Sequence, residues 1–365
     1  MNTRTEEMTN TDLFSPISLG DLTLPNRMIM APLTRNRAAM PGNVPQAMNV
    51  TYYAQRASAG LIITEATQVS PEGVGYPATP GIHSKEQVQG WRAVTDAVHA
   101  LGGHLFLQLW YCGRISHPDL LPDNQQPVSA SAIKPAGDAV TYAGMKAFVE
   151  PRALRSDELP GIVDQYRQAA KRAREAGFDG VEIHAANGYL LDQFLRDGTN
   201  RRTDNYGGAL ENRTRLLMEV LAAVLETWEP ARVGVRISPE SSFNDMHDAD
   251  PQATFNYVAR ALSGKGLGYL HGVEGEMLTG ERTLDYRQIR DHFDGPYMAN
   301  GGYDQALARA ALASRDADMV SFGKLYLANP DLVERFKTNA ELNVPDVDTF
   351  YGGNEKGYTD YPALV

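Results

Sequence analysis

One segment of the chain carries three polar residues whose types and spacing could do chemistry on a small molecule. His184, Asn187 and Tyr189 stand together in HAANGY. A His and an Asn three residues apart can face the same way on one turn and donate hydrogen bonds to one carbonyl or nitro oxygen. The phenol of Tyr189, with an ordinary pKa of about 10, can give a proton to a developing carbanion. The alternative is a hydrogen-bonded His at a strand end and a Tyr of the core.

A second group of residues, near the C-terminus, is suited to binding an anion. Gly301-Gly302 follows one short apolar run, and Gly323-Lys324 follows the next. Glycine turns let backbone N–H groups approach an anion closely, and phosphate sites in α/β barrels are frequently built after the last two strands. Either turn alone could be only a tight turn, with Lys324 a solvated cation. Their occurrence after both final runs favours a phosphate site.

Arg236 places a charge on an otherwise apolar run, VGVRIS. Because buried charges need partners, this residue indicates a bound anion, an electron-rich ring or an internal salt bridge. The remaining motifs are weaker evidence for a functional site. Asp245, His247, Asp248 and Asp250 could bind a metal, but a solvated loop is favoured, and Cys112 is not favoured as a nucleophile. GKGLG at 264–268 is not a dinucleotide fingerprint, and the chain has no P-loop, HExxH or GxSxG motif.

These residues need a scaffold, and short apolar runs alternate with helix-period segments along the chain. The runs that predict buried strands are Arg27–Met30, Leu61–Thr64, His104–Leu109, Gly180–His184, Arg232–Ile237, Tyr269–Val273, Tyr297–Asn300 and Met319–Ser321. Helix spacing recurs in 85–101, 162–176, 216–224, 252–263 and 303–313. This alternation predicts a single (β/α)8 barrel, with an open doubly wound sheet as the alternative. The candidate residues then lie at the C-terminal ends of strands, where barrel active sites occur.

Two segments interrupt the alternation. Ile17–Leu19 and Leu22–Leu24 flank Gly20-Asp21 and predict a hairpin that closes the barrel floor. About fifty residues after the third predicted strand are too many for a structureless loop, so they predict a folded cap at about 110–157. We therefore expect a short, flexible N-terminal extension over 1–11 and a barrel over 12–365.

Composition excludes several classes of protein. The 365 residues include 34 Lys and Arg against 45 Asp and Glu, a net charge of −11, which disfavours nucleic acid as a partner. One cysteine cannot form an intrachain disulfide or hold an iron–sulfur cluster, and no metal site is expected. The N-terminus lacks the apolar core of a signal peptide, and no apolar run approaches the ~20 residues of a membrane helix. We expect a soluble, cytoplasmic protein, monomeric or homodimeric.

The chain resembles the old yellow enzyme family of FMN-dependent ene-reductases from about residue 12 to 365. The resemblance rests on PISLGDLTLPNRMIMAPLTRNR, GLIITEATQVSPEG, LQLW, GVRISP, ANGGYD, SFGKLYLANPDL and FYGGNEKGYTDYP. Its most specific part is HAANGYLLDQFLRDGTNRRTDNYGGALENR. The sequence is most similar to the bacterial branch that reduces nitrate esters, maleimides and enones. It departs from the family pattern at Tyr111-Cys112 and at Lys324, where Arg is usual.

The resemblance implies a role for each candidate residue. It implies flavin contacts for Pro32, Leu33, Thr34, Ala66, Gln108 and Arg236, and FMN phosphate contacts for Gly301, Gly302, Gly323 and Lys324. His184 and Asn187 would hold the electron-withdrawing oxygen of the substrate, and Tyr189 would be the catalytic proton donor. Tyr76, Trp110 and Tyr351 would wall the pocket.

The implied activity is the reduction of activated C=C bonds in enones, enals, maleimides and nitroalkenes, and of nitrate esters. NAD(P)H, with NADPH favoured, would reduce non-covalently bound FMN, after which the alkene takes hydride from flavin N5 and a proton from Tyr189. The alternatives are a flavin-free barrel aldolase, a dienoyl-CoA-type reductase without an iron–sulfur cluster, and a non-catalytic flavin or ligand carrier. An aldolase needs no such phosphate site together with Gln108 and Arg236, and a carrier has no use for Tyr189.

Overall fold

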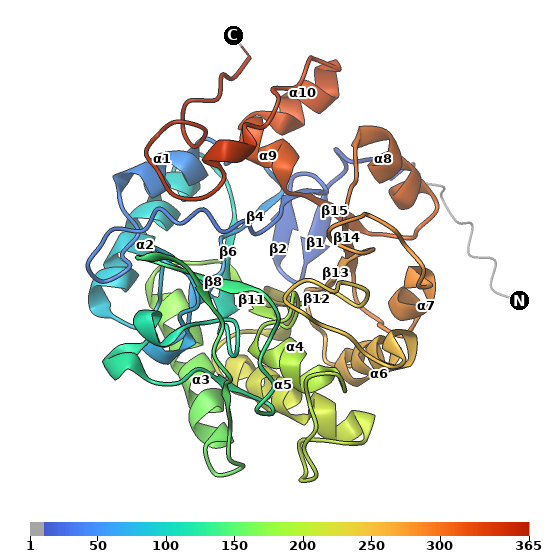
Figure 1. The fold of residues 1–365 in the computed structure, drawn as a ribbon. Helices are drawn as coiled ribbons and strands as arrows, with labels where there is room; N and C mark the ends of the chain where they lie inside the picture. The colour runs from blue at the N-terminus through green and yellow to red at the C-terminus, as the bar shows by residue number, and fades with distance from the viewer. Residues whose placement is uncertain (1–10, 365) are drawn as a thin grey trace, which may run out of the picture.

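Eight short parallel strands close into a barrel in the computed structural model, which describes residues 11–364 (Figure 1). The strands are β3 (Met28–Met30), β4 (Leu61–Ile63), β6 (Leu105–Trp110), β11 (Gly180–His184), β12 (Val233–Ile237), β13 (Tyr269–Val273), β14 (Tyr297–Asn300) and β15 (Met319–Phe322). The pairing of β15 with β3, in the register Val320↔Met28, completes the ring. The predicted (β/α)8 barrel is confirmed, and the open sheet is excluded.

The ends of each strand lie within one residue of those predicted from the sequence. The prediction is this accurate because both faces of a barrel strand are buried, so its sequence is apolar almost throughout. β11, β12 and β13 are buried at every position, so their sequences read as nearly continuous apolar runs. The few polar side chains on these strands point into the barrel or stand at its C-terminal end, which makes them conspicuous. Such a residue needs a partner, and the partners define the candidate site.

Helices surround the barrel in Figure 1. They are α1 (Ala47–Ala54), α2 (Lys85–His99), α3 (Leu159–Glu175), α5 (Leu210–Leu225), α6 (Pro251–Leu262), α7 (Tyr286–Asp291), α8 (Gln305–Ala313), α9 (Lys324–Ala328) and α10 (Leu332–Thr338), with the short α4 (Leu190–Leu195) after β11. In α3 the buried residues Ile162, Tyr166, Ala169 and Ala173 recur at three and four residues, the spacing that predicted the helix. Among residues 11–364 no helix combines the length and the apolar composition of a membrane span.

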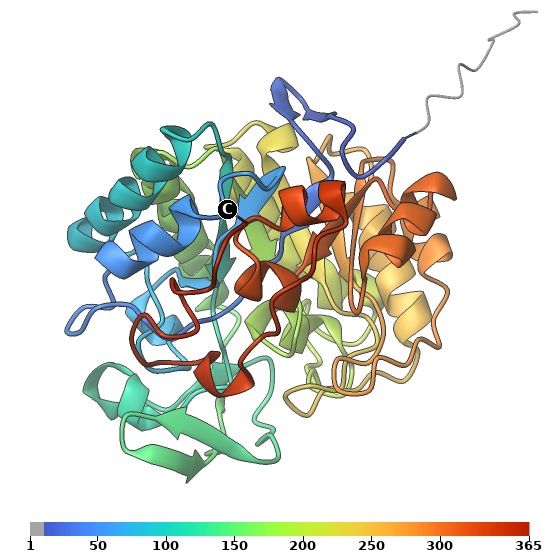
Figure 2. The same ribbon diagram turned by 90° about the horizontal axis from the view of Figure 1, so that it is seen from above.

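Two hairpins mark opposite ends of the barrel (Figure 2). β1 (Ile17–Leu19) and β2 (Leu22–Leu24) pair antiparallel, as predicted, and turn at Gly20 with φ +63°. Their leucines pack against the lower barrel interior, including Phe106 and Tyr269, and so close its floor. The other hairpin is β8 (Asp138–Thr141) with β9 (Gly144–Ala147).

The segment between β6 and α3 has structure of its own. Besides β8 and β9 it contains β7 (Val128–Ser129), β10 (Arg152–Ala153) and the 3-10 turns Pro118–Leu120 and Pro122–Asn124. Short β5 (Thr67–Gln68) pairs parallel with the C-terminal end of β6, and further 3-10 turns span Pro71–Gly73, Pro230–Arg232 and Val347–Thr349. At the tip of the β8–β9 hairpin, Tyr142 Oη accepts from the Ala78 N–H at 3.0 Å. The division into extension, barrel and cap stays a prediction, and residues 1–10 lie outside the described residues.

Candidate active site

The loop after β11 presents His184 and Tyr189 with an unusual backbone between them. β11 ends at His184, and Tyr189 is the N-cap of α4. Asn187 and Gly188 both have left-handed conformations, with φ +59° and +77°, so the expected arrangement on one helical turn is wrong. Only glycine fits at 188, since a Cβ there would lie 2.7 Å from Asn244 Cβ.

Four of the predicted substrate-side residues gather into an aromatic cluster. The Trp110 ring stacks on Tyr76 at a centroid distance of 5.7 Å and meets Tyr189 edge-on at 4.8 Å. The rings of His184 and Tyr189 are 5.1 Å apart, and Tyr189 Oη donates to Tyr76 Oη at 3.3 Å. Tyr351 differs, because 71% of it is exposed. It nonetheless lies close enough to Tyr76 to contribute to the raised pKa of that phenol, after burial and Cys112.

Burial fixes the protonation states of the two chemical groups in this cluster. Desolvation, with Arg236 and His271 nearby, holds the pKa of His184 well below its usual value, so the ring is neutral at pH 7. Its Nδ1 is buried and has no hydrogen-bond partner among the described residues. Desolvation also raises the pKa of Tyr189 well above 10, with a smaller contribution from Tyr76. Tyr189 therefore keeps its proton, as a proton donor must.

A buried hydrogen-bond network supports Gln108 and Arg236 from below. Gln108 Nε2 donates to Glu182 at 2.7 Å, and His271 Nδ1 lies 2.8 Å from the other oxygen of that carboxylate. Burial would raise the pKa of Glu182, but interactions with His271, Arg236 and Gln108 outweigh it and hold this pKa below its usual value. Desolvation and the Arg236 charge lower the pKa of His271 to about 4. Sequence reasoning missed Glu182 and His271, although polar residues inside apolar strands were the available signal.

Arg236 has no direct salt bridge among residues 11–364, so the internal salt bridge that the sequence left open for this charge is not formed there. Its guanidinium lies 3.1 Å from His271 Nε2 and donates to Asn300 Oδ1 at 3.0 Å. The Glu182 carboxylate makes no direct contact with the guanidinium but lies close enough for its charge to favour the protonated Arg236, opposing the desolvation that lowers the pKa of this group. Nε of Arg236 is buried with no partner among the described residues. A cation with a free N–H at the end of β12 can bind an anion or an electron-rich ring.

The predicted phosphate residues follow β14 and β15. Gly301 has φ +117°, and a Cβ there would lie 2.3 Å from the Glu274 carbonyl oxygen, so no other residue fits. The amides of Gly301, Gly302 and Gly323 donate to no acceptor within residues 11–364, and Lys324 is exposed without an ion pair there. These groups are thus available to an anion.

The predicted flavin-lining segments adjoin these turns. Pro32, Leu33 and Thr34 follow β3 and are partly exposed, and a Cβ on Gly323 would meet Leu33 Cδ2 at 3.3 Å. Ala66 is buried against the aromatic cluster that contains Trp110 and Tyr189. The ends of β3, β14 and β15 therefore offer one continuous surface.

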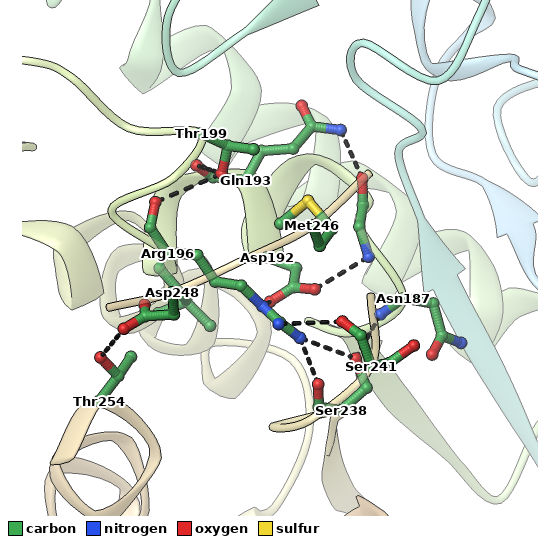
Figure 3. Close-up of polar contacts among 12 residues, drawn as sticks. Asn187, Asp192, Gln193, Arg196, Thr199, Ser238, Ser241, Met246, Asp248 and Thr254 are labelled. Atoms are coloured by element: carbon green, nitrogen blue, oxygen red, sulfur yellow. Dashed lines mark hydrogen bonds and ion pairs between the residues drawn. The ribbon is translucent and has the colours of Figure 1, made fainter. Parts of the chain in front are cut away.

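A second polar network underlies the His184–Tyr189 loop (Figure 3). Arg196 Nε donates to Asp192 Oδ1 at 2.9 Å, and Arg196 also donates to the Ser241 and Ser238 carbonyls. This buried ion pair joins α4 to the loop after β12. Sequence reasoning did not assign a role to any of these four residues.

Two remaining candidates have structural roles. Asp248 binds Arg213 at 3.0 Å and is nearly buried, so it does not lie in a fully solvated loop. No group of three potential metal ligands occurs in the described part of the chain. Cys112 is buried, and burial raises the pKa of its thiol well above its usual value, which disfavours a nucleophilic role. Its carbonyl accepts from Gln193 at 3.0 Å, so Cys112 also supports the loop.

Comparison with known proteins identifies the family of the chain. Residues 12–343 match the model of the NADH:flavin oxidoreductase / NADH oxidase family. The chain belongs to this family. It is 45% identical over 361 residues to 12-oxophytodienoate reductase 1 of Oryza sativa subsp. japonica, covering 96% of this chain and 93% of that protein.

Solved structures of family members superpose closely. Morphinone reductase in complex with tetrahydroNAD is 50% identical with a TM-score of 0.92, covering 97% of this chain and 98% of that one. The old yellow enzyme homologue from Zymomonas mobilis is 46% identical with a TM-score of 0.93, covering 97% and 100%. The resemblance to the old yellow enzymes is confirmed. The chain is an NAD(P)H-dependent flavin oxidoreductase of that family.

The residues present fit FMN. The amides of Gly301, Gly302 and Gly323, which donate to no acceptor among the described residues, and Lys324 would hold its phosphate. Arg236 Nε, a buried donor that has no partner among the described residues, would hold an electron-rich edge of the ring. FMN supplies hydride chemistry when bound.

Proposed function

We propose that this enzyme reduces alkenes conjugated to a carbonyl, nitro or imide group, with FMN as the bound cofactor and NADPH as the preferred reductant. The observation that carries the proposal is the neutral, orphaned His184 Nδ1 beside the protonated Tyr189 at the C-terminal end of the barrel. One group offers a hydrogen bond to the substrate, and the other offers a proton. Enones, enals, maleimides and nitroalkenes have this chemistry, and nitrate esters likewise carry an electron-withdrawing group whose oxygens accept hydrogen bonds.

Each residue contributes through its position. His184 and Asn187 hold the electron-withdrawing oxygen of the alkene and stabilise the negative charge that develops there. Tyr189 Oη gives its proton to Cα, while the Tyr76 hydroxyl, 3.3 Å away, holds the phenol in place. Trp110, buried behind both rings, excludes water from this side, and Tyr351 walls the open side.

The cofactor residues act in two groups. Gly301, Gly302, Gly323 and Lys324 hold the phosphate, whereas Pro32, Leu33, Thr34, Ala66 and Gln108 line the ring. The Arg236 cation, fixed by His271 and Asn300, stabilises negative charge on the ring edge. We also propose that the two substrates use one site in turn, which gives ping-pong kinetics, and that the enzyme is cytoplasmic.

The test begins with the chromophore. The purified chain should be yellow, and heat should release FMN, because the turns after β14 and β15 bind one phosphate group. NADPH should bleach the flavin without oxygen, and cyclohexenone or N-ethylmaleimide should restore its absorbance. FAD, or no flavin after flavin-replete expression, would contradict the proposal. A flavin that NADPH and NADH both leave oxidised would indicate a carrier instead.

A further inference from the structure

The backbone of Asn187 is held from outside by two side chains of the loop after β12. Its N–H donates to Ser238 Oγ at 2.7 Å, and its carbonyl accepts from Asn244 Nδ2 at 2.8 Å. Ser238 is fully buried, and Figure 3 shows it lying between Arg196 and Asn187. Both bonds come from residues more than fifty positions later in the chain.

The next residue is held in the same way by α4. The Gly188 N–H donates to Asp192 Oδ2 at 2.9 Å, and its carbonyl accepts from Gln193 Nε2 at 2.7 Å. The other oxygen of Asp192 binds Arg196. The N–H and C=O groups of two successive residues, four polar groups in all, therefore bind side chains rather than the ladder of a helix or sheet.

We call these four hydrogen bonds to the backbone of Asn187 and Gly188 the frame, and at Asn187 the frame stabilises an unfavourable backbone conformation. A left-handed backbone is unfavourable for a residue with a Cβ, and Asn187 adopts it at φ +59°. The direction of a side chain follows from its backbone, so the frame also sets where the Asn187 amide points. The Oδ1 of that amide is buried without a hydrogen-bond partner among the described residues, so no hydrogen bond to this oxygen fixes its direction.

We propose that Ser238 is a positioning residue for the substrate clamp and acts through the backbone of Asn187. The Ser238 hydroxyl accepts the Asn187 N–H, keeps the left-handed turn and so orients the Asn187 amide toward the substrate oxygen. This inference rests on the proposed function, since it requires Asn187 to bind substrate. Ser238 itself touches neither substrate nor flavin in this scheme.

The experiment is a double-mutant cycle on the flavin-loaded enzyme, with 4-chlorophenol as the probe. Binding of the phenol is followed by the change in flavin absorbance. Ser238→Ala should weaken phenol binding about tenfold, the size of one lost hydrogen bond. In the Asn187→Ala background, Ser238→Ala should change the phenol Kd less than about twofold, since the group that Ser238 positions is gone. FMN content should be unchanged throughout.

Ser241→Ala is the matched control, because Ser241 is equally buried in the same loop but, within residues 11–364, its hydroxyl binds only the Phe243 N–H, at 3.3 Å. It should leave the phenol Kd unchanged. If Ser238→Ala fails to fold, Ser238→Cys, which leaves no cavity and offers a much weaker acceptor, takes its place. An unchanged Kd, or effects of Ser238→Ala and Asn187→Ala that add, would overturn the inference while the proposed function stands. If 4-chlorophenol does not change the flavin spectrum of the parent enzyme, both the inference about Ser238 and the proposed function are refuted.

Discussion

Replacing Tyr189 with Phe removes one hydroxyl and distinguishes substrates that need a proton from Tyr189 from substrates that can take it from water. The ring still packs edge-on against Trp110 and His184, so the substitution leaves the aromatic cluster intact. The lost contact is the 3.3 Å bond to Tyr76, long for O–H···O, so the free energy of unfolding should fall by about 1 kcal/mol or less. We expect the variant to bind FMN and to be reduced by NADPH at the parent rate.

The expected kinetic effect depends on the substrate. An enolate needs a proton at Cα, and general acid catalysis typically contributes about 10²–10⁴-fold, so oxidation by cyclohexenone should slow by that factor. A nitronate is stable enough to leave and take its proton from water, so oxidation by a nitroalkene should slow little. Stopped-flow measurement of flavin reoxidation with each substrate checks both rates. Free nitronate should accumulate transiently in its absorbance band.

Tyr76→Phe is the control, because it removes the same hydrogen bond and leaves the Tyr189 hydroxyl in place. It should slow cyclohexenone reduction less than about tenfold. Burial raises the pKa of Tyr189 well above 10, so the parent rate with cyclohexenone should not fall between pH 7 and 9 through ionisation of this group. Equal slowing of both substrates in Tyr189→Phe would assign the proton to another group. No slowing of either would refute the catalytic role of Tyr189.

Three further predictions concern the surroundings of this donor. Replacing both His184 and Asn187 with Ala should slow enone reduction roughly 10²-fold or more while flavin reduction by NADPH persists; an unchanged enone rate in stopped flow would place the clamp elsewhere. Arg37 donates to the carbonyls of Thr349 and Asn354, on either side of Tyr351. Arg37→Met should therefore change the ratio of kcat/KM between bulky and small enones in the same direction as Tyr351→Ala does. An unchanged ratio would contradict this prediction. His271 has its pKa lowered from 6.5 to about 4, so folding opposes its protonation, and the free energy of unfolding should fall as the pH drops from 6.5 toward 4. Urea titrations at constant excess FMN should show His271→Gln losing less stability than the parent over this range, by about 3 kcal/mol at most; parallel curves would refute the buried neutral His271.

The barrel and the end of it that carries the candidate site could both be predicted from the amino-acid sequence. Buried parallel strands are nearly continuous apolar runs, so β11, β13 and β14 could be delimited to the residue, and the polar residues that interrupt or follow such runs, His184 and Arg236 among them, stood out. These are local signals that need no knowledge of neighbouring strands. Residue types at strand ends therefore indicated the chemistry before any contact was known.

Only the tertiary structure decided which partners these residues have. His271 binds Glu182 across 89 residues of chain, and this contact makes Arg236 part of a network rather than of a direct salt bridge. Asn187 depends on Ser238, 51 residues away, for its left-handed turn. The spacing of residues within one segment suggested a helical turn at Asn187. Such spacing contains no information about a hydrogen bond that comes from another loop. Local patterns follow from the chain's own periodicity, whereas the orientation of a buried polar group is set by the side chains that satisfy it after folding.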